Sequence, residues 1–270
     1  MVFSSMVFLC IFLPVVFLLH LLLPGIRAKN GMLLLASLAF YAYGEPVYVI
    51  LMIASAFVNY LSALLIEKNP AGKKAVMAVN VILNLGVLVL FKYTGFLAES
   101  VNTIFGTAIP VPSIRLPIGI SFFTFQAMSY VIDVYRGVTG AQKNFGKVLL
   151  YISFFPQLIA GPIVKYHDIA QEIENRTQTV DGVTDGIRRF VVGLSKKVLI
   201  SNTVGLVADT LFAADVSGLN AAAAWIGAVS YMLQIYFDFS GYSDMAIGLG
   251  EMFGFHFKEN FNYPYISGSI

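Results

Sequence analysis

An otherwise apolar stretch near the C-terminal end of the chain carries four groups that could do chemistry. Asp238, Ser240, Asp244 and Glu251 all lie within YFDFSGYSDMAIGLGEMFGF, residues 236–255. Carboxylates and hydroxyls can exchange protons with a substrate or bind a polar ligand. Lipid rejects such groups, at about 2.5 to 3.5 kcal/mol for a carboxylate in the middle of a span. The stretch therefore lies outside a membrane, or is buried among helices around a wet or catalytic interior.

The composition decides between these two interpretations. Of the 270 residues, 58% are hydrophobic and 12% are charged, with a mean hydropathy of +0.78, whereas soluble globular chains carry about 25% charged residues. The chain is therefore expected to be an integral membrane protein. A net charge of +2 gives no reason to expect nucleic acid as a partner. With one cysteine, Cys10, we expect neither a disulfide framework nor a metal site.

Several apolar segments are long enough, or nearly so, to cross a hydrocarbon core of about 30 Å. The first, Met6–Leu23, precedes the first basic residues and is interpreted as an uncleaved span rather than a secretory signal. We predict an all-α, polytopic bundle of transmembrane helices forming a single membrane domain over residues 1–270. The further segments are Gly31–Tyr43, Val47–Ile66, Ala75–Tyr93, Leu116–Val134, Val148–Val164, Phe190–Phe212, Ala221–Tyr236 and Tyr242–Phe257.

The segment Val148–Val164 is expected to be irregular. It contains Pro156 and the pair Gly161 and Pro162, which interrupt helical hydrogen bonding. We predict a bent or re-entrant segment, because membranes tolerate broken helices where protein or a water-filled cavity covers the exposed backbone. The side chain of Gln157 is placed to satisfy the backbone groups that such a bend sets free.

The basic residues predict the orientation. With the N-terminus outside, fourteen of the seventeen Lys and Arg residues fall on the cytoplasmic side, provided that the bent segment returns to the side it left. The polar stretch Lys165–Arg189 is predicted to be a cytoplasmic amphipathic segment where a soluble ligand docks, and the connection Glu99–Arg115 is predicted to lie outside. The fourteen are Arg27, Lys29, Lys68, Lys73, Lys74, Arg136, Lys143, Lys147, Lys165, Arg176, Arg188, Arg189, Lys196 and Lys197.

The polar residues of the last segment have two interpretations. Asp244, Gly248 and Glu251 are spaced four and then three, which places them on one helical face. They could hold helices together, since Gly250 and Gly254 form a small-xxx-small pattern typical of helix packing in membranes. Several costly groups within two turns nevertheless exceed what packing requires, so as a group they also indicate a functional interior.

Three sequence motifs carry a family resemblance. They are LPIGISFFTFQAMSYVIDVYRG (116–137), FFPQLIAGPIVKYHDI (154–169) and YFDFSGYSDMAIGLGEMFGFHFKENFNYPYIS (236–267). In this order they resemble the membrane-bound O-acyltransferase family, and within it the bacterial branch that acetylates alginate and other polysaccharides. The likeness runs along the whole chain. A weaker likeness is to the membrane protein that passes D-alanine to teichoic acids.

The resemblance implies an enzyme of the bacterial inner membrane whose helices surround a funnel. Such enzymes take an acyl group from a cytoplasmic donor, acetyl-CoA or an acyl-carrier thioester, and transfer it to a hydroxyl. In this branch the acetyl group moves towards periplasmic acetyltransferase partner proteins that modify an exported polysaccharide. Attack on a thioester requires a general base and groups that stabilise the oxyanion, and a histidine is the base in this family. The resemblance implies no bound cofactor.

The histidines of this chain depart from the family pattern. The two family histidines, one in a Trp-His pair soon after the Asn-Tyr-Pro-Tyr motif, come later than Ile270. The chain's own histidines are His20, His167 and His256, and none occupies a family catalytic motif. His20 is expected in packing, His167 in a solvated loop and His256 at an interface. No catalytic residue is therefore assigned, and the chain is expected to be an N-terminal part that is inactive alone.

Other residues carry over as funnel or scaffold groups. Gln126 and Asp133, seven apart on one face, are expected to line the interior, with Arg136 at the cytoplasmic boundary; the alternative is an ion pair of Asp133 with Arg136 at a helix end. Asp238 to Asp244 would hold the last helices together, and Asn260 to Pro264 would cap the preceding helix or contact a ligand. The candidates are Gln126, Asp133, Arg136, Pro156, Gln157, Gly161, Pro162, Asp238, Ser240, Tyr242, Asp244, Asn260, Asn262 and Tyr263.

Two alternative functions stay open on the sequence. The first keeps the enzyme class and changes the donor to a D-alanyl carrier protein. A basic and apolar docking face on the cytoplasmic side would support it. The second is a proton-coupled transporter, since intramembrane acids and broken helices also occur in carriers. The sequence shows no paired repeat of the broken segment, which counts against transport.

Overall fold

A computed structural model describes residues 2–112, 114–158, 164–215, 218–259, 261 and 263–268. Within these ranges the chain consists of helices joined by turns and loops, with no strand, which confirms the predicted all-α class. The helices group into two compact units, made of Met1–Leu22, Ala160–Val164 and Asn175–Ile270, and of Leu23–Ile159 and Lys165–Glu174. The single membrane domain predicted from the sequence stays a prediction.

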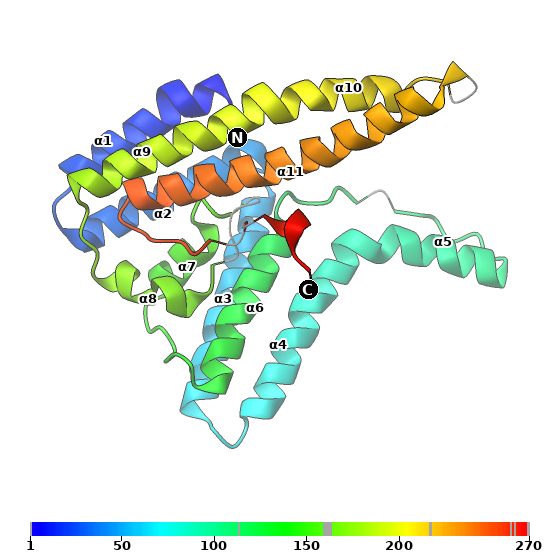
Figure 1. The fold of residues 1–270 in the computed structure, drawn as a ribbon. Coiled ribbons are helices and arrows are strands. Elements are labelled where there is room, and N and C mark those ends of the chain that lie inside the picture. The colour runs from blue at the N-terminus through cyan, green and yellow to red at the C-terminus, as the bar shows by residue number, and fades with distance from the viewer. Residues whose placement is uncertain are drawn as a thin grey trace. The chain divides into compact units, whose positions relative to one another are not determined.

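The first unit is built on two long helical stretches that lie side by side (Figure 1). One runs from α9 through the π-helical turn η3 into α10, and the other is the single helix α11. The side chains of Thr179 and Asn220 accept backbone N–H groups at the starts of α9 and α11, as N-cap residues do. The elements are η1 Phe8–Phe12, α1 Leu13–Leu22, α9 Val180–Ser195, η3 Lys196–Ser201, α10 Asn202–Phe212, α11 Ala221–Met252 and η5 Pro264–Ile266.

The second unit is organised around α3. This helix packs against both α4 and α6, while α7 contacts α2 and α3, and α8 contacts α6. In Figure 1 the helices α3, α6 and α4 run next to one another. The elements are α2 Gly25–Gly44, α3 Tyr48–Lys68, α4 Lys73–Leu88, η2 Val89–Tyr93, α5 Thr94–Phe105, α6 Ile120–Arg136, α7 Phe145–Ser153 and α8 Tyr166–Glu174.

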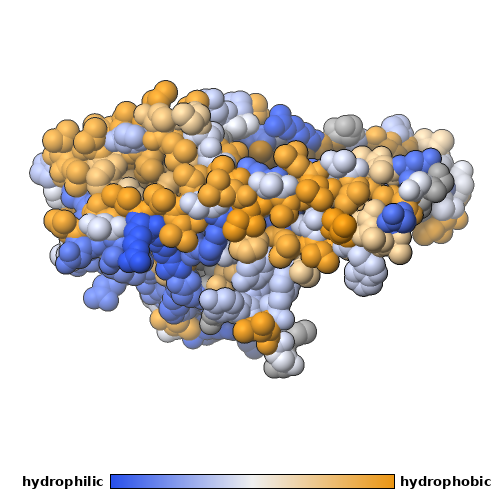
Figure 2. Space-filling model, turned by 45° about the horizontal axis from the view of Figure 1, so that its top comes forward, coloured by the Kyte–Doolittle hydropathy of each residue, from blue (hydrophilic) through white to orange (hydrophobic). Residues whose placement is uncertain are grey.

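The outer surfaces of the helices are apolar. Among the described residues, three helical stretches are long and apolar enough to cross a membrane: Tyr48–Lys68, Lys73–Phe105 and Val180–Phe212. Large hydrophobic side chains such as Ile82 and Leu199 are exposed on them, and Figure 2 shows apolar side chains over much of the face it presents. Water disfavours exposed apolar surface of this extent, and lipid accepts it. The chain is a membrane protein.

Two boundaries predicted from the sequence are wrong because helices continue through the expected breaks. Ala221–Tyr236 and Tyr242–Phe257 are expected as separate segments, but α11 runs from Ala221 to Met252; the residues between the two segments include one glycine and no proline, which is too weak an interruption to end a helix. The polar stretch Lys165–Arg189, for which the sequence predicts an amphipathic segment, forms α8 and the first turns of α9. Glu99, expected in an external connection, lies within α5.

A buried network of asparagines joins α3 to α4. The Asn59 side chain donates to Asn84 Oδ1 at 3.0 Å and accepts from Asn80 Nδ2 at 3.0 Å and Asn84 Nδ2 at 3.1 Å. Asn80 also donates to Ser62 Oγ at 3.1 Å. Asn59 and Asn80 are fully buried. Because buried amides must find partners, the network fixes the register of the two helices.

We predict that Asn59→Ala destabilises the protein by about 1 to 2 kcal/mol, because it removes the donor to the buried Asn84 Oδ1 and one acceptor of each of the Asn80 and Asn84 amides. The free energy of unfolding in bilayers, measured by steric trapping, checks this. Asn202→Ala is the matched control, since Asn202 is exposed at the start of α10 and its loss is expected to change stability by less than about 0.5 kcal/mol. Equal effects of the two substitutions would contradict the assigned role of the network.

Candidate functional site

Helices α9 and α11 of the first unit approach so closely that glycines are required at their contact. A Cβ atom on Gly193 would lie 2.5 Å from the carbonyl oxygen of Gly241, and one on Gly186 would lie 2.6 Å from that of Gly248. Real Cβ atoms do not approach other atoms this closely. The pairing of Gly186 with Gly248 and of Gly193 with Gly241 shows that the helices run antiparallel. The seven-residue spacing on both is two helical turns, which keeps the contact on one face.

The glycine pair predicted for packing has a different role. Gly250 faces the ring of Phe257, and Gly254 follows the end of α11 with a φ of +81°. The Gly254 and Phe255 amides donate to the carbonyl oxygens of Glu251 and Gly250, which is the pattern of a Schellman C-cap. The small-xxx-small interpretation of Gly250 and Gly254 is therefore wrong, because the second glycine ends the helix rather than packing on another.

The close contact brings Asp244 against two cations of the neighbouring stretch. The Arg189 guanidinium donates to Asp244 Oδ1 from Nε at 3.3 Å and from Nη2 at 3.1 Å. The Lys196 ammonium donates to Asp244 Oδ2. Only 16% of the Asp244 side chain is exposed. A carboxylate in such surroundings is tolerated because it is paired and hydrogen-bonded on both oxygens.

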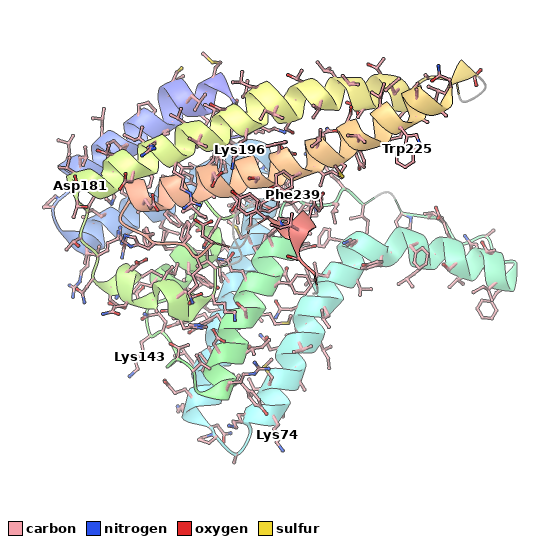
Figure 3. All side chains as sticks on the ribbon, viewed as in Figure 1. Lys74, Lys143, Asp181, Lys196, Trp225 and Phe239 are labelled. Atoms are coloured by element: carbon pink, nitrogen blue, oxygen red, sulfur yellow. The ribbon has the colours of Figure 1, made fainter. Side chains whose placement is uncertain are left out.

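Two further ion pairs lie beside these contacts, one between the two helical stretches and one to the chain after α11. Lys197 pairs with Asp238, whose side chain is 45% exposed, and Arg189 also pairs with Glu259. The ammonium group of Lys196 donates to Ser240 Oγ at 3.0 Å, and Figure 3 shows where Lys196 lies along its helix. Two carboxylates of the opening stretch, Asp238 and Asp244, are thus paired with cations of a neighbouring helix.

The other candidate residues of this unit have different surroundings. Tyr242 stacks on Phe3, with ring centroids 4.7 Å apart. Tyr263 has a φ of +47°, a left-handed conformation uncommon for a residue other than glycine. His20, predicted to be a packing residue, is buried edge-on against Phe253. Asn260 and Asn262 lie outside the described residues.

In the second unit, two carboxamides converge on one carbonyl oxygen where the helix α7 ends. Gln126 Nε2 donates to the Tyr151 carbonyl oxygen at 3.0 Å, and Gln157 Nε2 donates to the same oxygen. The Phe155 amide, which would bond Tyr151 in a continuing helix, donates instead to Ser37 Oγ at 3.2 Å. The expectation that Gln157 satisfies a freed backbone group is confirmed.

The residues around this turn agree with a broken segment up to Leu158. Pro156 has no N–H to donate, and the chain leaves the helical conformation at Phe154, with a ψ of 113°. Gln157 is buried, and its Oε1 atom has no hydrogen-bond partner among the residues that the structure describes. Gly161 and Pro162 lie outside the described residues. The re-entrant path predicted for Val148–Val164 stays a prediction.

His167 is held rather than solvated, so its predicted place in a solvated loop is wrong. Its Nδ1 atom lies 2.7 Å from Asp133 Oδ2, and its Nε2 atom lies 3.4 Å from Asp168 Oδ1. Among the described residues the partner of Asp133 is therefore His167 on α8 and not Arg136, as the alternative expectation had it. Arg136 is exposed and lines a hollow of about 440 Å³ together with Glu67.

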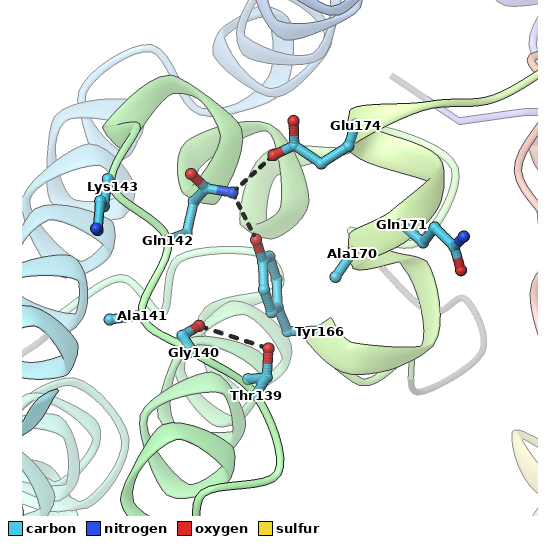
Figure 4. A pocket seen from close by; sticks show the side chains of 9 residues that line it. All are labelled: Thr139, Gly140, Ala141, Gln142, Lys143, Tyr166, Ala170, Gln171 and Glu174. Atoms are coloured by element: carbon cyan, nitrogen blue, oxygen red, sulfur yellow. Dashed lines mark hydrogen bonds between the residues drawn. The ribbon is translucent and has the colours of Figure 1, made fainter.

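A second pocket of about 440 Å³ lies between α8 and the loop of residues 139–143 (Figure 4). The Gln142 amide donates to the Tyr166 hydroxyl at 3.1 Å and to Glu174 at 3.0 Å. A hydrogen bond from Lys147 lowers the pKa of Glu174, and burial raises the pKa of Tyr166. The polar groups of this pocket bind one another and hold α8 to the loop.

The structure thus separates the predicted candidates into two groups. Gln126, Asp133, Arg136, Pro156 and Gln157 belong to the second unit. Asp238, Ser240, Tyr242, Asp244 and Tyr263 belong to the first. A common interior for the two groups stays a prediction. In the described part of the chain, no group of three or more His, Cys, Asp or Glu side chains is placed to hold a metal ion.

The sequence analysis did not identify the cations that pair with Asp238 and Asp244. Arg189 and Lys196 are seven residues apart, and Gly186 and Gly193 repeat at the same spacing. On α11, Gly241 and Gly248 repeat likewise, with Asp244 between them. These matching heptads were the available signal, since an antiparallel pair of such helices brings opposite charges together beside the glycines.

Comparisons with known proteins identify the family. Residues 138–267 match the model of the membrane-bound O-acyltransferase family. The whole chain aligns, at 46% identity, with a probable alginate O-acetylase of Pseudomonas aeruginosa and covers 53% of it. The chain belongs to the membrane-bound O-acyltransferase family. It spans about half the length of the curated relatives it matches.

Two further curated proteins are similar at lower identity. A peptidoglycan O-acetyltransferase of Helicobacter pylori is 34% identical over 98% of this chain and 56% of the relative. A teichoic acid D-alanyltransferase of Bacillus subtilis is 29% identical over 57% of this chain and 39% of the relative. The likeness to the acetyltransferases therefore extends over more of the chain than the likeness to the D-alanyltransferase.

We predict that the Lys196 and Asp244 side chains are coupled by about 1 to 3 kcal/mol in a double-mutant cycle, because Asp244 is largely shielded from solvent. The cycle combines Lys196→Met with Asp244→Asn and measures the free energy of unfolding in bilayers. Lys197→Met with Asp238→Asn is the matched control cycle; Asp238 is more exposed, so its coupling is expected to stay below about 1 kcal/mol. Equal couplings in the two cycles would contradict the assigned difference.

Proposed function

We propose that the chain forms part of a membrane O-acyltransferase that moves an acetyl group from a cytoplasmic donor towards hydroxyls of an exported polysaccharide, as in alginate O-acetylation. The observation that carries the proposal is the 46% identity with a probable alginate O-acetylase over the whole of this chain. The 34% identity with a peptidoglycan O-acetyltransferase over 98% of the chain supports the same reaction class with a different polymer.

The donor in this proposal is acetyl-CoA or an acyl-carrier thioester. Transfer needs a base that removes the proton of the accepting group and donors that stabilise the oxyanion. The family resemblance puts the base on a histidine later than Ile270. The residues of this chain then act as scaffold: the α9–α11 contact with its ion pairs, and the turn after α7 where Gln126 and Gln157 hold the Tyr151 carbonyl group. Gln157 Oε1 is buried and has no hydrogen-bond partner among the described residues, so we assign it as one acceptor for a bound group.

The proposed location is the bacterial inner membrane, crossed several times with the N-terminus outside. The apolar helices support the membrane location. The orientation is supported by the predicted cytoplasmic grouping of ten of the fourteen Lys and Arg residues, those that lie outside the stretch Val180–Phe212. The partners in the proposal are membrane lipid, periplasmic acetyltransferase proteins that receive the acetyl group, and the exported polysaccharide. An acceptor on the far side of the membrane explains why the reaction needs a membrane-spanning enzyme.

D-alanyl transfer to teichoic acid from a carrier protein is the second candidate. It is favoured by the 29% identity with a teichoic acid D-alanyltransferase, which covers 57% of this chain. The acidic groups that would favour a third candidate, a proton-coupled transporter, are balanced by cations at Asp244 and Asp238. This balance weakens the case for a mobile proton on those two side chains.

The experiment that tests the proposal expresses the complete gene in an alginate-producing Pseudomonas strain that lacks its own O-acetylase. Acetyl esters on the secreted alginate are measured by proton NMR. We expect the gene to restore acetylation, and the 270-residue chain expressed alone to leave the alginate unacetylated, because the family histidines come later. The control is the same strain with an empty vector.

Other outcomes contradict the proposal in distinct ways. D-alanine on the teichoic acids of a Bacillus strain that lacks its D-alanyltransferase, without any acetylation of alginate, would establish the second candidate. Proton-driven uptake by vesicles that contain the purified protein, with no transfer in either strain, would favour transport. Acetylation by the 270-residue chain alone would contradict the expectation that the later histidines are needed.

A further inference from the structure

Helix α5 carries an apolar face that nothing in the described part of the second unit covers. None of its residues is buried. Leu97, Val101 and Ile104 follow one another at spacings of four and three, which places them on one face, and the side chains of Leu97 and Ile104 are 47% and 73% exposed. The exposed Glu99 and Thr103 lie on the other side of the helix, beside one exposed aromatic side chain, Phe96, so α5 has a continuous apolar face and a mainly polar one.

The chain that follows α5 packs on its polar side. Asn102 Oδ1 accepts from the Ile109 amide at 2.8 Å and from Thr107 Oγ1 at 2.8 Å, while Asn102 Nδ2 donates to the Ile109 carbonyl oxygen at 2.8 Å. A Cβ atom on Gly95, seven residues before Asn102, would lie 3.8 Å from Val111. The chain after α5 thus packs against the side of the helix opposite to Leu97, Val101 and Ile104. It leaves this apolar face uncovered.

The position of α5 along the chain fixes its depth in a bilayer. From Lys73 to Tyr93 a helix rises about 30 Å at 1.5 Å per residue, which equals the hydrocarbon thickness. Lys92 and Tyr93 lie at the end of this helical stretch that is farther from Lys73. The Lys92 ammonium lies 5.7 Å from the centroid of the Tyr93 ring. Lysine and tyrosine are typical anchors at a membrane interface. A straight continuation to Phe105 would overshoot the bilayer.

The helix changes direction at this depth for an identifiable reason. Residues Val89–Tyr93 form a π-helical turn, and the Thr94 hydroxyl donates to the carbonyl oxygen of Leu90. Both features bend helices. In Figure 1 α5 leaves the direction of α4, and a positive φ of 63° at Gly106 ends it.

We propose that α5 is an interfacial helix that binds the lipid surface of the leaflet opposite to Lys73 and Lys74. Its face of Leu97, Val101 and Ile104 enters the boundary between headgroups and acyl chains, and Glu99 and Thr103 face water. A lipid surface fits this face because the span before it ends at the interface, and because an amphipathic helix at that depth buries its apolar side in acyl chains. The bend at Val89–Tyr93 and the anchors Lys92 and Tyr93 therefore support an orientation of α5 parallel to the membrane surface.

The test attaches a fluorescent label to single cysteines in the full chain reconstituted in phosphatidylcholine and phosphatidylglycerol vesicles. Cys10 is first replaced by alanine. Labels go to positions 97, 101 and 104, to positions 99 and 103 on the polar side, and to position 82 in the middle of α4 as a deep control. Quenching is compared between a lipid-borne quencher and a water-soluble one. Five separate label sites on α5 keep the result interpretable if one variant fails to fold.

We expect the lipid-borne quencher to act several-fold more strongly at 97, 101 and 104 than at 99 and 103, at one common depth shallower than at position 82. The water-soluble quencher is expected to show the reverse order at 99 and 103. Depth that decreases steadily from 97 to 104, on both sides of the helix alike, would overturn the proposal in favour of a helix that continues straight out of the bilayer. Protection of 97, 101 and 104 from both quenchers would mean that protein covers this face, and equal access of water to both sides would mean that α5 stands off the membrane.

Discussion

The close approach of α9 and α11 is the constraint on which the first unit depends. Two pairs of glycines, Gly186 with Gly248 and Gly193 with Gly241, let the backbones meet at distances that no side chain allows. This approach places Asp244 within hydrogen-bond reach of Arg189 and Lys196. Without it, a carboxylate in the middle of a long apolar helix would be buried unpaired, which costs several kcal/mol.

The same physical requirement governs the turn after α7. There the backbone itself is the polar group that needs a partner, because Phe155 donates its amide to Ser37 and Pro156 has none to donate. The carboxamides of Gln126 and Gln157 take over at the Tyr151 carbonyl oxygen. At these two places buried polar groups are paired within the chain. Other buried polar atoms, among them Gln157 Oε1 and Gln234 Oε1, have no hydrogen-bond partner within the described part of the chain.

The sequence was sufficient for features that depend on composition and on local chemistry. Low charge and long apolar runs predicted an all-α membrane protein, and the prolines near Gln157 predicted both a break and the role of this side chain. The interruption expected between the two halves of α11 failed because Gly241 alone does not end a helix. Gly254 was misread because a glycine that ends a helix and a glycine that packs on one share the same spacing.

Features that depend on pairing between distant segments could not be read from one segment. The partner of Asp244 lies on a helix some fifty residues earlier, and the partner of Asp133 is His167 on α8 rather than Arg136 one turn away. Local spacing favours the neighbour on the same helix, whereas tertiary packing decides which group is within reach. The glycine heptads of α9 and α11 become informative once the two helices are known to be antiparallel.

The most direct test of this account measures the coupling between Lys196 and Asp244 in a Gly193→Leu background. A leucine at this position forces α9 away from Gly241, so the account predicts that the coupling in bilayers falls to near zero, while Gly86→Leu, at a glycine with open space around it, leaves the coupling intact. A coupling that persists undiminished in the Gly193→Leu protein would contradict the claim that the glycine contact is what neutralises Asp244.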